Sequence, residues 1–142
     1  IYPQLAEDTV AIPTVSIART FWEKVTVLHY LYFLPEDRAT PSRHSRHFYD
    51  IYKLFQSPYQ NEILQAAGLL DSIISFDRKF YTKRGVDYDS ISTSTLRLYP
   101  SKARIEDLRK DYEQMNEMIF GTAPSWNELM DFCKELEKQL HS

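Results

Sequence analysis

Apolar residues that recur every three or four positions constrain the fold of this chain more than any other feature. The clearest run lies between positions 105 and 120 and consists of Ile105, Leu108, Tyr112, Met115 and Ile119. This spacing places the side chains on one face of an α-helix. The sequence also has only three glycines, which leaves few positions for tight turns. A mainly α-helical fold is therefore predicted.

Helical spacing, capping residues and prolines together predict where the helices lie. The expected helices cover residues 20–33, 45–56, 59–67, 69–81, 105–120 and 126–140. Thr20 with Glu23, and Ser125 with Glu128, have the spacing of a capping box, which marks a helix start. Gly121 stands where a helix C-terminus is expected. Residues 85–104 are predicted to be irregular, with an extended stretch at 95–99.

The N-terminal segment has a different pattern. Residues 10–17 are rich in β-branched side chains and are predicted to be extended. Pro13 cannot donate a backbone hydrogen bond, so such a strand would lie at a sheet edge. No second convincing strand is nearby, and the chain does not begin with methionine. We therefore expect a fragment, in which residues 1–19 complete the sheet of a core that is missing and residues 20–142 form a helical bundle.

Composition excludes several classes of protein. The formal net charge is -3, so any contact with nucleic acid would need a local basic patch. Cys133 is the only cysteine, which excludes an internal disulfide and a zinc site made of thiolates. No stretch approaches the about 20 apolar residues of a membrane span, and no signal peptide is present. We expect a cytoplasmic protein without a membrane-spanning segment.

Two short runs carry most of the functional signal. Residues 20–29 place Lys24 in an otherwise apolar helix start, and residues 43–53 gather basic side chains around Asp50. The basic side chains of the second run are Arg43, His44, Arg46, His47 and Lys53. Cations opposite a carboxylate suit a site that handles phosphate.

Simpler explanations of the same residues stay open. Lys24 also fits an ordinary surface lysine, and Asp50 fits a solvated ion pair within its own helix. His44, His47 and Asp50 could also form a metal trio, but their spacing is broad for one ion.

A second basic stretch lies near positions 78–84. Arg78, Lys79, Lys83 and Arg84 are interleaved there with two aromatic residues, Phe80 and Tyr81. This combination suits RNA, because cations meet phosphates and rings stack on bases, and it equally suits a helix C-terminus. Asp87 and Asp89 have the spacing of a magnesium-binding pair, although a solvated acidic loop explains them better.

Together, these blocks resemble a known family. Residues 19–29 and 45–54, supported by 95–100, 111–121 and 124–125, are similar to the C-terminal half of the AbiEii/AbiGii nucleotidyltransferase toxins. Members are the toxins of bacterial abortive-infection and related toxin–antitoxin systems. The resemblance implies a core like that of DNA polymerase β followed by helices. It also implies use of a nucleoside triphosphate and Mg²⁺, a cognate antitoxin, and an acceptor that is tRNA in some members.

The resemblance assigns roles to particular residues. The active-site lysine of the family falls on Lys24, and its later aspartate falls on Asp50. Arg46 and His47 belong to the same block, and together with Arg43 they would bind the phosphates of the nucleotide. The Gly-Ser turn and the Asp-x-Asp metal pair of the family would precede residue 1, so no metal site is expected within this chain.

Three functional hypotheses follow. The first is a nucleotidyltransferase-type toxin, with transfer to tRNA in the full-length protein and none by this chain alone. The second is a non-catalytic helical module that binds RNA, through Arg78, Lys79, Lys83 and Arg84, or an antitoxin. The third is a metal hydrolase built on His44, His47 and Asp50.

Overall fold

The computed structural model describes residues 14–116 and 123–142, and this part of the chain is helical without strands. The elements are α2 (Thr14–Tyr32), α3 (Ser45–Phe55), α4 (Gln60–Gln65), α5 (Leu69–Phe80), the short 3-10 helix η1 (Tyr88–Ser90), α6 (Ile105–Asn116) and α7 (Trp126–His141). The predicted mainly α-helical class is confirmed. None of the helices in these two ranges is long and apolar enough to cross a membrane.

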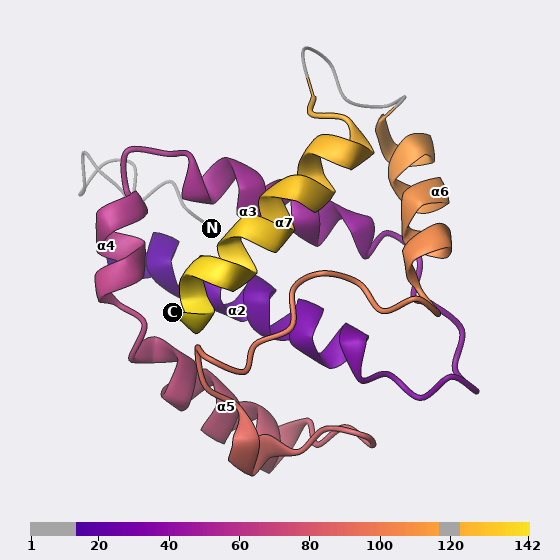
Figure 1. Ribbon diagram of the computed structural model, residues 1–142. Coiled ribbons are helices and arrows are strands. Elements are labelled where there is room, and N and C mark those ends of the chain that lie inside the picture. Colours follow the sequence, from indigo (N-terminus) through magenta and orange to yellow (C-terminus); the bar gives the residue numbers. More distant parts are fainter. Residues whose placement is uncertain (1–13, 117–122) are drawn as a thin grey trace, which may run out of the picture.

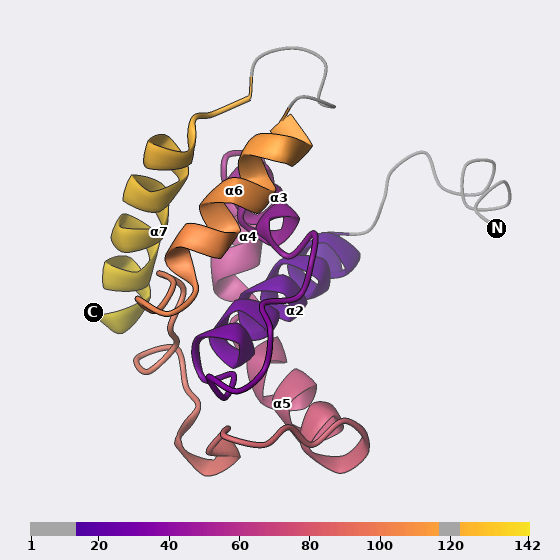
Figure 2. The same cartoon turned by 90° about the vertical axis from the view of Figure 1, so that its right-hand side faces the viewer.

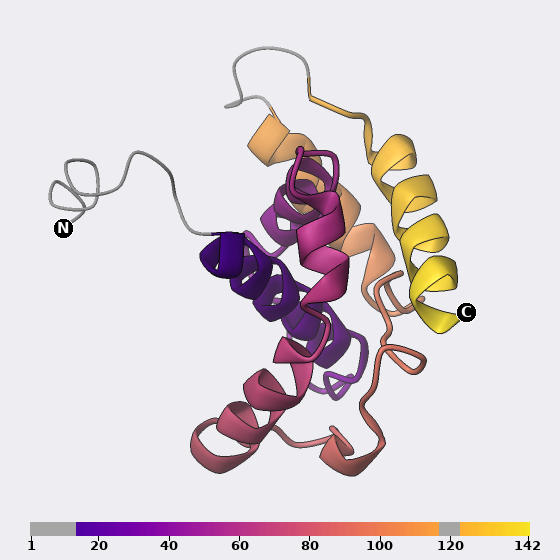
Figure 3. The same ribbon diagram turned by 90° about the vertical axis from the view of Figure 1, so that its left-hand side faces the viewer.

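Helix α2 is the centre of the arrangement. It packs against α3, α4 and α5, while α3 also contacts α6 and α7 (Figure 1). Figures 2 and 3, which show the molecule from opposite sides, place α7 along one side of the molecule and α5 at the bottom of both views. Because α2 contacts three helices, its side chains are buried around most of its circumference, and the core is built on it.

The start of α2 corrects the predicted N-terminal strand. Thr14–Tyr32 is one helix, so the extended conformation predicted up to residue 17, and the extended domain up to residue 19, are wrong from Thr14 onward. Thr20 lies inside this helix and is not its N-cap. Ala18, Phe21 and Trp22 are almost completely buried, and this packing outweighs the weak helix propensity of the β-branched residues. Residues 1–13 lie outside the described part of the chain.

The other helices lie close to their predicted ranges. α3, α4 and α5 are each one to three residues shorter than predicted. The capping box of α7 is confirmed: Ser125 Oγ accepts from the backbone N–H of Glu128 at 3.1 Å, and Glu128 Oε1 accepts from that of Ser125 at 3.0 Å. The predicted last turn of α6 and its end at Gly121 lie outside the described residues.

The segment predicted to be extended at 95–99 forms no strand. Its backbone N–H groups donate instead to side chains of α2 and α7. Arg97 N donates to His29 Nδ1 at 3.0 Å, and Leu98 N donates to Glu137 Oε1 at 2.7 Å. Burial, with the charge of Arg97, lowers the pKa of His29 to about 4, so its ring stays neutral and can accept. The segment therefore bridges α2 and α7 without a neighbouring strand.

The turn after α5 requires glycine. Gly85 has a φ of +91°, and a Cβ there would lie 2.7 Å from the carbonyl oxygen of Phe33. Gly85→Ala is expected to destabilise the fold by about 1–3 kcal/mol, measured by urea unfolding. Gly68 is the matched control, because its φ is -61° and a Cβ there meets nothing within 4 Å. Gly68→Ala should leave stability unchanged or raise it by about 0.5 kcal/mol, and equal losses at both positions would contradict this account of Gly85.

Candidate functional site

The structure brings Lys24 and Asp50 into direct contact. Lys24 comes from α2 and Asp50 from α3, and Lys24 Nζ lies 2.9 Å from Asp50 Oδ2. Farther along the same two helices the rings of Phe21 and Phe55 stack with centroids 5.7 Å apart, which fixes α3 against α2. The two charged side chains are 24% and 23% exposed, so a ligand can reach them although both are partly desolvated.

Arg46 extends the positive charge of this pair. Its Nε lies 3.8 Å from Asp50 Oδ2, one turn away on α3, and its side chain is 71% exposed. A guanidinium has five N–H donors in a planar fork, and the contact with Asp50 is made by the Nε side of that fork. Asp50 therefore lies between a partly buried ammonium and an exposed guanidinium.

His47 lies in the same cluster but does not add a charge. Burial, together with the nearby charge of Lys24, lowers the pKa of His47 to about 4. Its Nδ1 is buried and has no hydrogen-bond partner among the described residues. The ring of His44 contacts it edge-on at 5.0 Å, and burial lowers the pKa of His44 as well. At neutral pH the positive charge of the cluster thus comes from Lys24 and Arg46.

Arg43 is held in place through its backbone. It precedes α3 with a φ of 64°, and its backbone N–H donates to Asp111 Oδ1 at 2.9 Å. Within residues 14–116 and 123–142 no ion pair joins the Arg43 side chain to Asp50. Arg43 is linked to Arg46 through the backbone, since the N–H of Arg46 donates to the carbonyl oxygen of Arg43 at 3.3 Å. The role of Arg43, Arg46 and His47 in phosphate binding stays a prediction.

The described residues do not fit a metal ion. Among them, no three His, Cys, Asp or Glu side chains are arranged so that they could hold one. Asp50 is engaged by Lys24, and Asp89 by Arg78 at 2.6 Å. Asp87 accepts from the backbone of Asp89 and caps η1. Neither the histidine trio nor the Asp-x-Asp pair considered from the sequence is thus assembled for Mg²⁺ or a transition metal.

The basic stretch at the end of α5 is partly neutralised. Arg78 pairs with Asp89, and Arg84 donates to both carboxylate oxygens of Asp37 at 3.0 and 3.1 Å. Lys79 and Lys83 instead lie over aromatic rings, those of Phe80 and Tyr30.

Exposed rings accompany these lysines. Phe76, Phe80 and Tyr81 are 48%, 58% and 60% exposed. The ring centroids of Phe76 and Phe80 are 4.8 Å apart. Phe76 lies one turn before Phe80 on the same helix and adds a third exposed ring to this surface.

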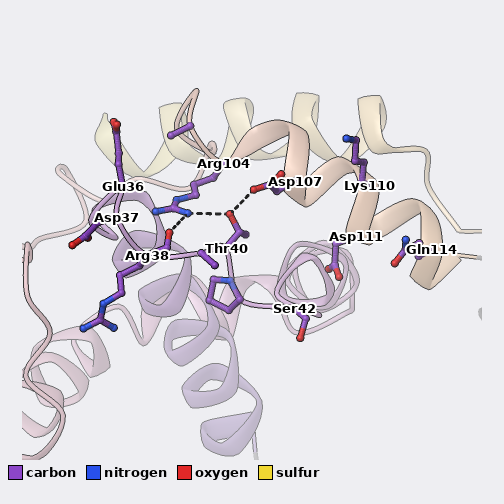
Figure 4. A pocket seen from close by; sticks show the side chains of 13 residues that line it. Glu36, Asp37, Arg38, Thr40, Ser42, Arg104, Asp107, Lys110, Asp111 and Gln114 are labelled. Carbon is purple, nitrogen blue, oxygen red and sulfur yellow. Dashed lines mark hydrogen bonds between the residues drawn. The ribbon is translucent and has the colours of Figure 1, made fainter.

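A polar cavity of ≈ 650 Å³ lies between residues 36–42 and α6 (Figure 4). Neither Lys24 nor Asp50 lines it. Arg104, only 4% exposed, lies at its wall and donates to the carbonyl oxygens of Pro35 and Arg38, both at 2.7 Å. These bonds fix the loop that leads into α3. No sequence pattern indicated this role, because the partners are about 65 to 70 residues apart.

Comparison with known proteins gives first the class and then the family. The chain is of the nucleotidyltransferase toxin type, because a family model of that type matches residues 1–135. The model is described as "Nucleotidyl transferase AbiEii toxin, Type IV TA system", and the chain belongs to this family. The resemblance found from the sequence is thereby confirmed, and membership implies an antitoxin partner. Comparisons with curated proteins and with solved structures found no match.

Proposed function

We propose that Lys24, Asp50 and Arg46 bind and orient the triphosphate of a nucleotide that the toxin transfers to an acceptor. The observation that carries this proposal is the contact of 2.9 Å between Lys24 and Asp50 across two helices, in a position that remains partly exposed. Lys24 neutralises phosphate charge, and Asp50 holds its ammonium in place before the ligand arrives. Arg46, and Arg43 from the turn before α3, supply further donors for phosphate oxygens.

The charges involved explain why a triphosphate can compete with Asp50 for the ammonium group of Lys24. A triphosphate carries several negative charges and Asp50 carries one, so the ammonium gains Coulomb energy when phosphate approaches. The partial burial of Lys24 strengthens that attraction relative to a fully solvated lysine. A carboxylate that already orients the ammonium also lowers the entropy lost on binding.

Magnesium would have to be held elsewhere. The family resemblance implies that an Asp-x-Asp pair of the nucleotidyltransferase core holds it, and among the described residues no group of His, Cys, Asp or Glu side chains fits a metal ion. We therefore propose that this chain alone transfers nothing and that the full-length protein is the enzyme.

For the acceptor, we propose tRNA. Lys79, which lies over the exposed ring of Phe80, and Lys83, two residues after the exposed Tyr81, support RNA binding, because rings stack on bases while ammonium groups meet phosphates. Arg78 and Arg84 contribute less, since each is already paired with a carboxylate. The same surface favours the second candidate function, a non-catalytic module that binds RNA. If this is the whole function, Lys24→Ala leaves growth inhibition intact, while Lys79→Glu with Lys83→Glu removes RNA binding.

Triphosphate binding tests the proposal. In the full-length protein, Lys24→Gln is expected to raise the Kd for a nucleoside triphosphate at least about tenfold, because a charge-assisted contact contributes roughly 1.5–3 kcal/mol. Isothermal titration calorimetry measures this. Arg19→Gln is the matched control, since Arg19 is also on α2 and pairs with Glu23 at 3.2 Å. A similar Kd for the wild type and Lys24→Gln would refute the assignment.

A further inference from the structure

Helix α3 has no N-cap of its own. His44 occupies the N-cap position, and its side chain makes no capping hydrogen bond. The N–H groups of Arg46 and His47 donate to the backbone carbonyl oxygens of Arg43 and His44 at 3.3 and 3.1 Å, so the N–H of Ser45, the first residue of α3, needs an acceptor from elsewhere. Arg46, His47 and Asp50 all lie in the first two turns of α3. The residue that supplies this acceptor therefore also influences where these three side chains lie.

Asp111 of α6 supplies it. One carboxylate oxygen accepts from the backbone N–H of Arg43 at 2.9 Å, and the other accepts from that of Ser45 at 3.1 Å. The hydroxyl of Ser45, a residue that is fully buried, donates to the same carboxylate. Partial burial opposes ionisation of Asp111, but these hydrogen bonds outweigh it and hold the pKa of the carboxyl below its usual value. An ionised carboxylate thus holds both ends of the turn.

The backbone at this turn needs such support. Arg43 has a φ of 64°, and among the described non-glycine residues only Arg43 has a positive φ. A side-chain-bearing residue keeps this conformation only where its surroundings enforce it. The turn points the N–H groups of Arg43 and Ser45 at one carboxylate, so Asp111 fixes both the turn and the direction in which α3 begins.

We propose that Asp111 is a positioning residue for the triphosphate site. Together with the Phe21–Phe55 stack at the other end of the helix contact, it sets the position of α3 on α2 and so the placement of Asp50 against Lys24. Asp111 itself does not contact the ligand. The inference rests on the proposed function for its effect on nucleotide, but its effect on the Lys24–Asp50 pair can be measured without nucleotide.

The test compares two aspartates of α6 in the full-length protein. Asp111→Asn keeps the size of the side chain but replaces one acceptor by a donor that faces an N–H group. Asp107→Asn is the matched control, because Asp107 lies one turn earlier and accepts from Thr40 Oγ1 at 2.9 Å in the same loop. Asp111→Asn is expected to raise the KM for the nucleoside triphosphate about tenfold or more, as loss of an orienting partner does at other sites, and Asp107→Asn to change it by less than about twofold.

A readout without nucleotide separates this proposal from the proposed function. In NMR spectra, Asp111→Asn should shift the Asp50 carboxyl and Lys24 ammonium resonances, whereas Asp107→Asn should not. If Lys24→Gln leaves triphosphate binding unchanged while these shifts appear, the proposed function fails and the positioning role stands. Ser45→Ala, a milder change at the same contact, should give a smaller shift in the same direction. Unchanged resonances in Asp111→Asn, or equal KM changes in both aspartate variants, would overturn the proposal.

Discussion

Replacing Lys24 by alanine in the full-length protein is expected to abolish growth inhibition and to slow nucleotide transfer at least about a hundredfold. The reason is electrostatic. One donor aimed at the charge that develops in the transition state typically raises the rate about a hundredfold or more. The fold should survive. A partly exposed ion pair contributes less than about 1 kcal/mol, and Asp50 keeps Arg46 as a neighbour. Transfer of labelled nucleotide and the thermal unfolding midpoint, measured on the same preparation, check both statements.

A second ion-paired cation provides the control for this result. Arg109 of α6 pairs with Glu106 and with Glu113, and it takes no part in the α2–α3 contact. Arg109→Ala should leave growth inhibition and transfer unchanged. Toxicity retained by Lys24→Ala, with the protein folded, would remove Lys24 from the active site.

Trp22→Ala is expected to have the largest effect on stability, a loss of about 3–5 kcal/mol. Trp22 is fully buried on α2, and its ring meets that of Phe21 edge-on at 5.2 Å. Its indole Nε1 donates to the carbonyl oxygen of Ile63 on α4 at 2.9 Å. Truncation would therefore leave a cavity where α2 meets α4 and remove one of the two hydrogen bonds to this carbonyl oxygen, which also accepts from the backbone N–H of Ala66 at 3.2 Å. Urea unfolding followed by circular dichroism measures the loss.

Trp22→Phe divides this effect into its two causes. Phenylalanine keeps most of the buried ring but cannot donate, so this variant should lose only about 1–2 kcal/mol. If Trp22→Ala cost less than Trp22→Phe, the packing of α2 against α4 would not be the source of stability inferred here.

Local sequence patterns predicted most of the helices but not the start of α2. Apolar spacing and the Ser125–Glu128 capping box are local features, and both located helices correctly. The β-branched residues of positions 10–17 favour an extended segment, because such residues have a low helix propensity. What overrides that preference is burial of Ala18 and Phe21 against other helices, which depends on tertiary packing.

The candidate site could be predicted only in part, for a similar reason. Lys24 and Asp50 were singled out by residue type and by resemblance to a family, and their contact of 2.9 Å exists only because α2 packs on α3. The cap provided by Asp111 is 66 residues away from Ser45 and left no local signal. The pairing of Arg84 with Asp37 also depends on tertiary packing, so no local sequence pattern indicated that this basic stretch is partly neutralised.

A double-mutant cycle on triphosphate binding tests most directly whether Lys24 and Asp50 form one functional unit. The Kd is measured by calorimetry for the wild-type full-length protein, Lys24→Gln, Asp50→Asn and the double variant. If Asp50 acts by orienting Lys24, Asp50→Asn changes the Kd in the wild-type background and has no effect once Lys24 has been replaced. The same fold-change in both backgrounds would show that the two side chains act independently, and it would contradict the site described here.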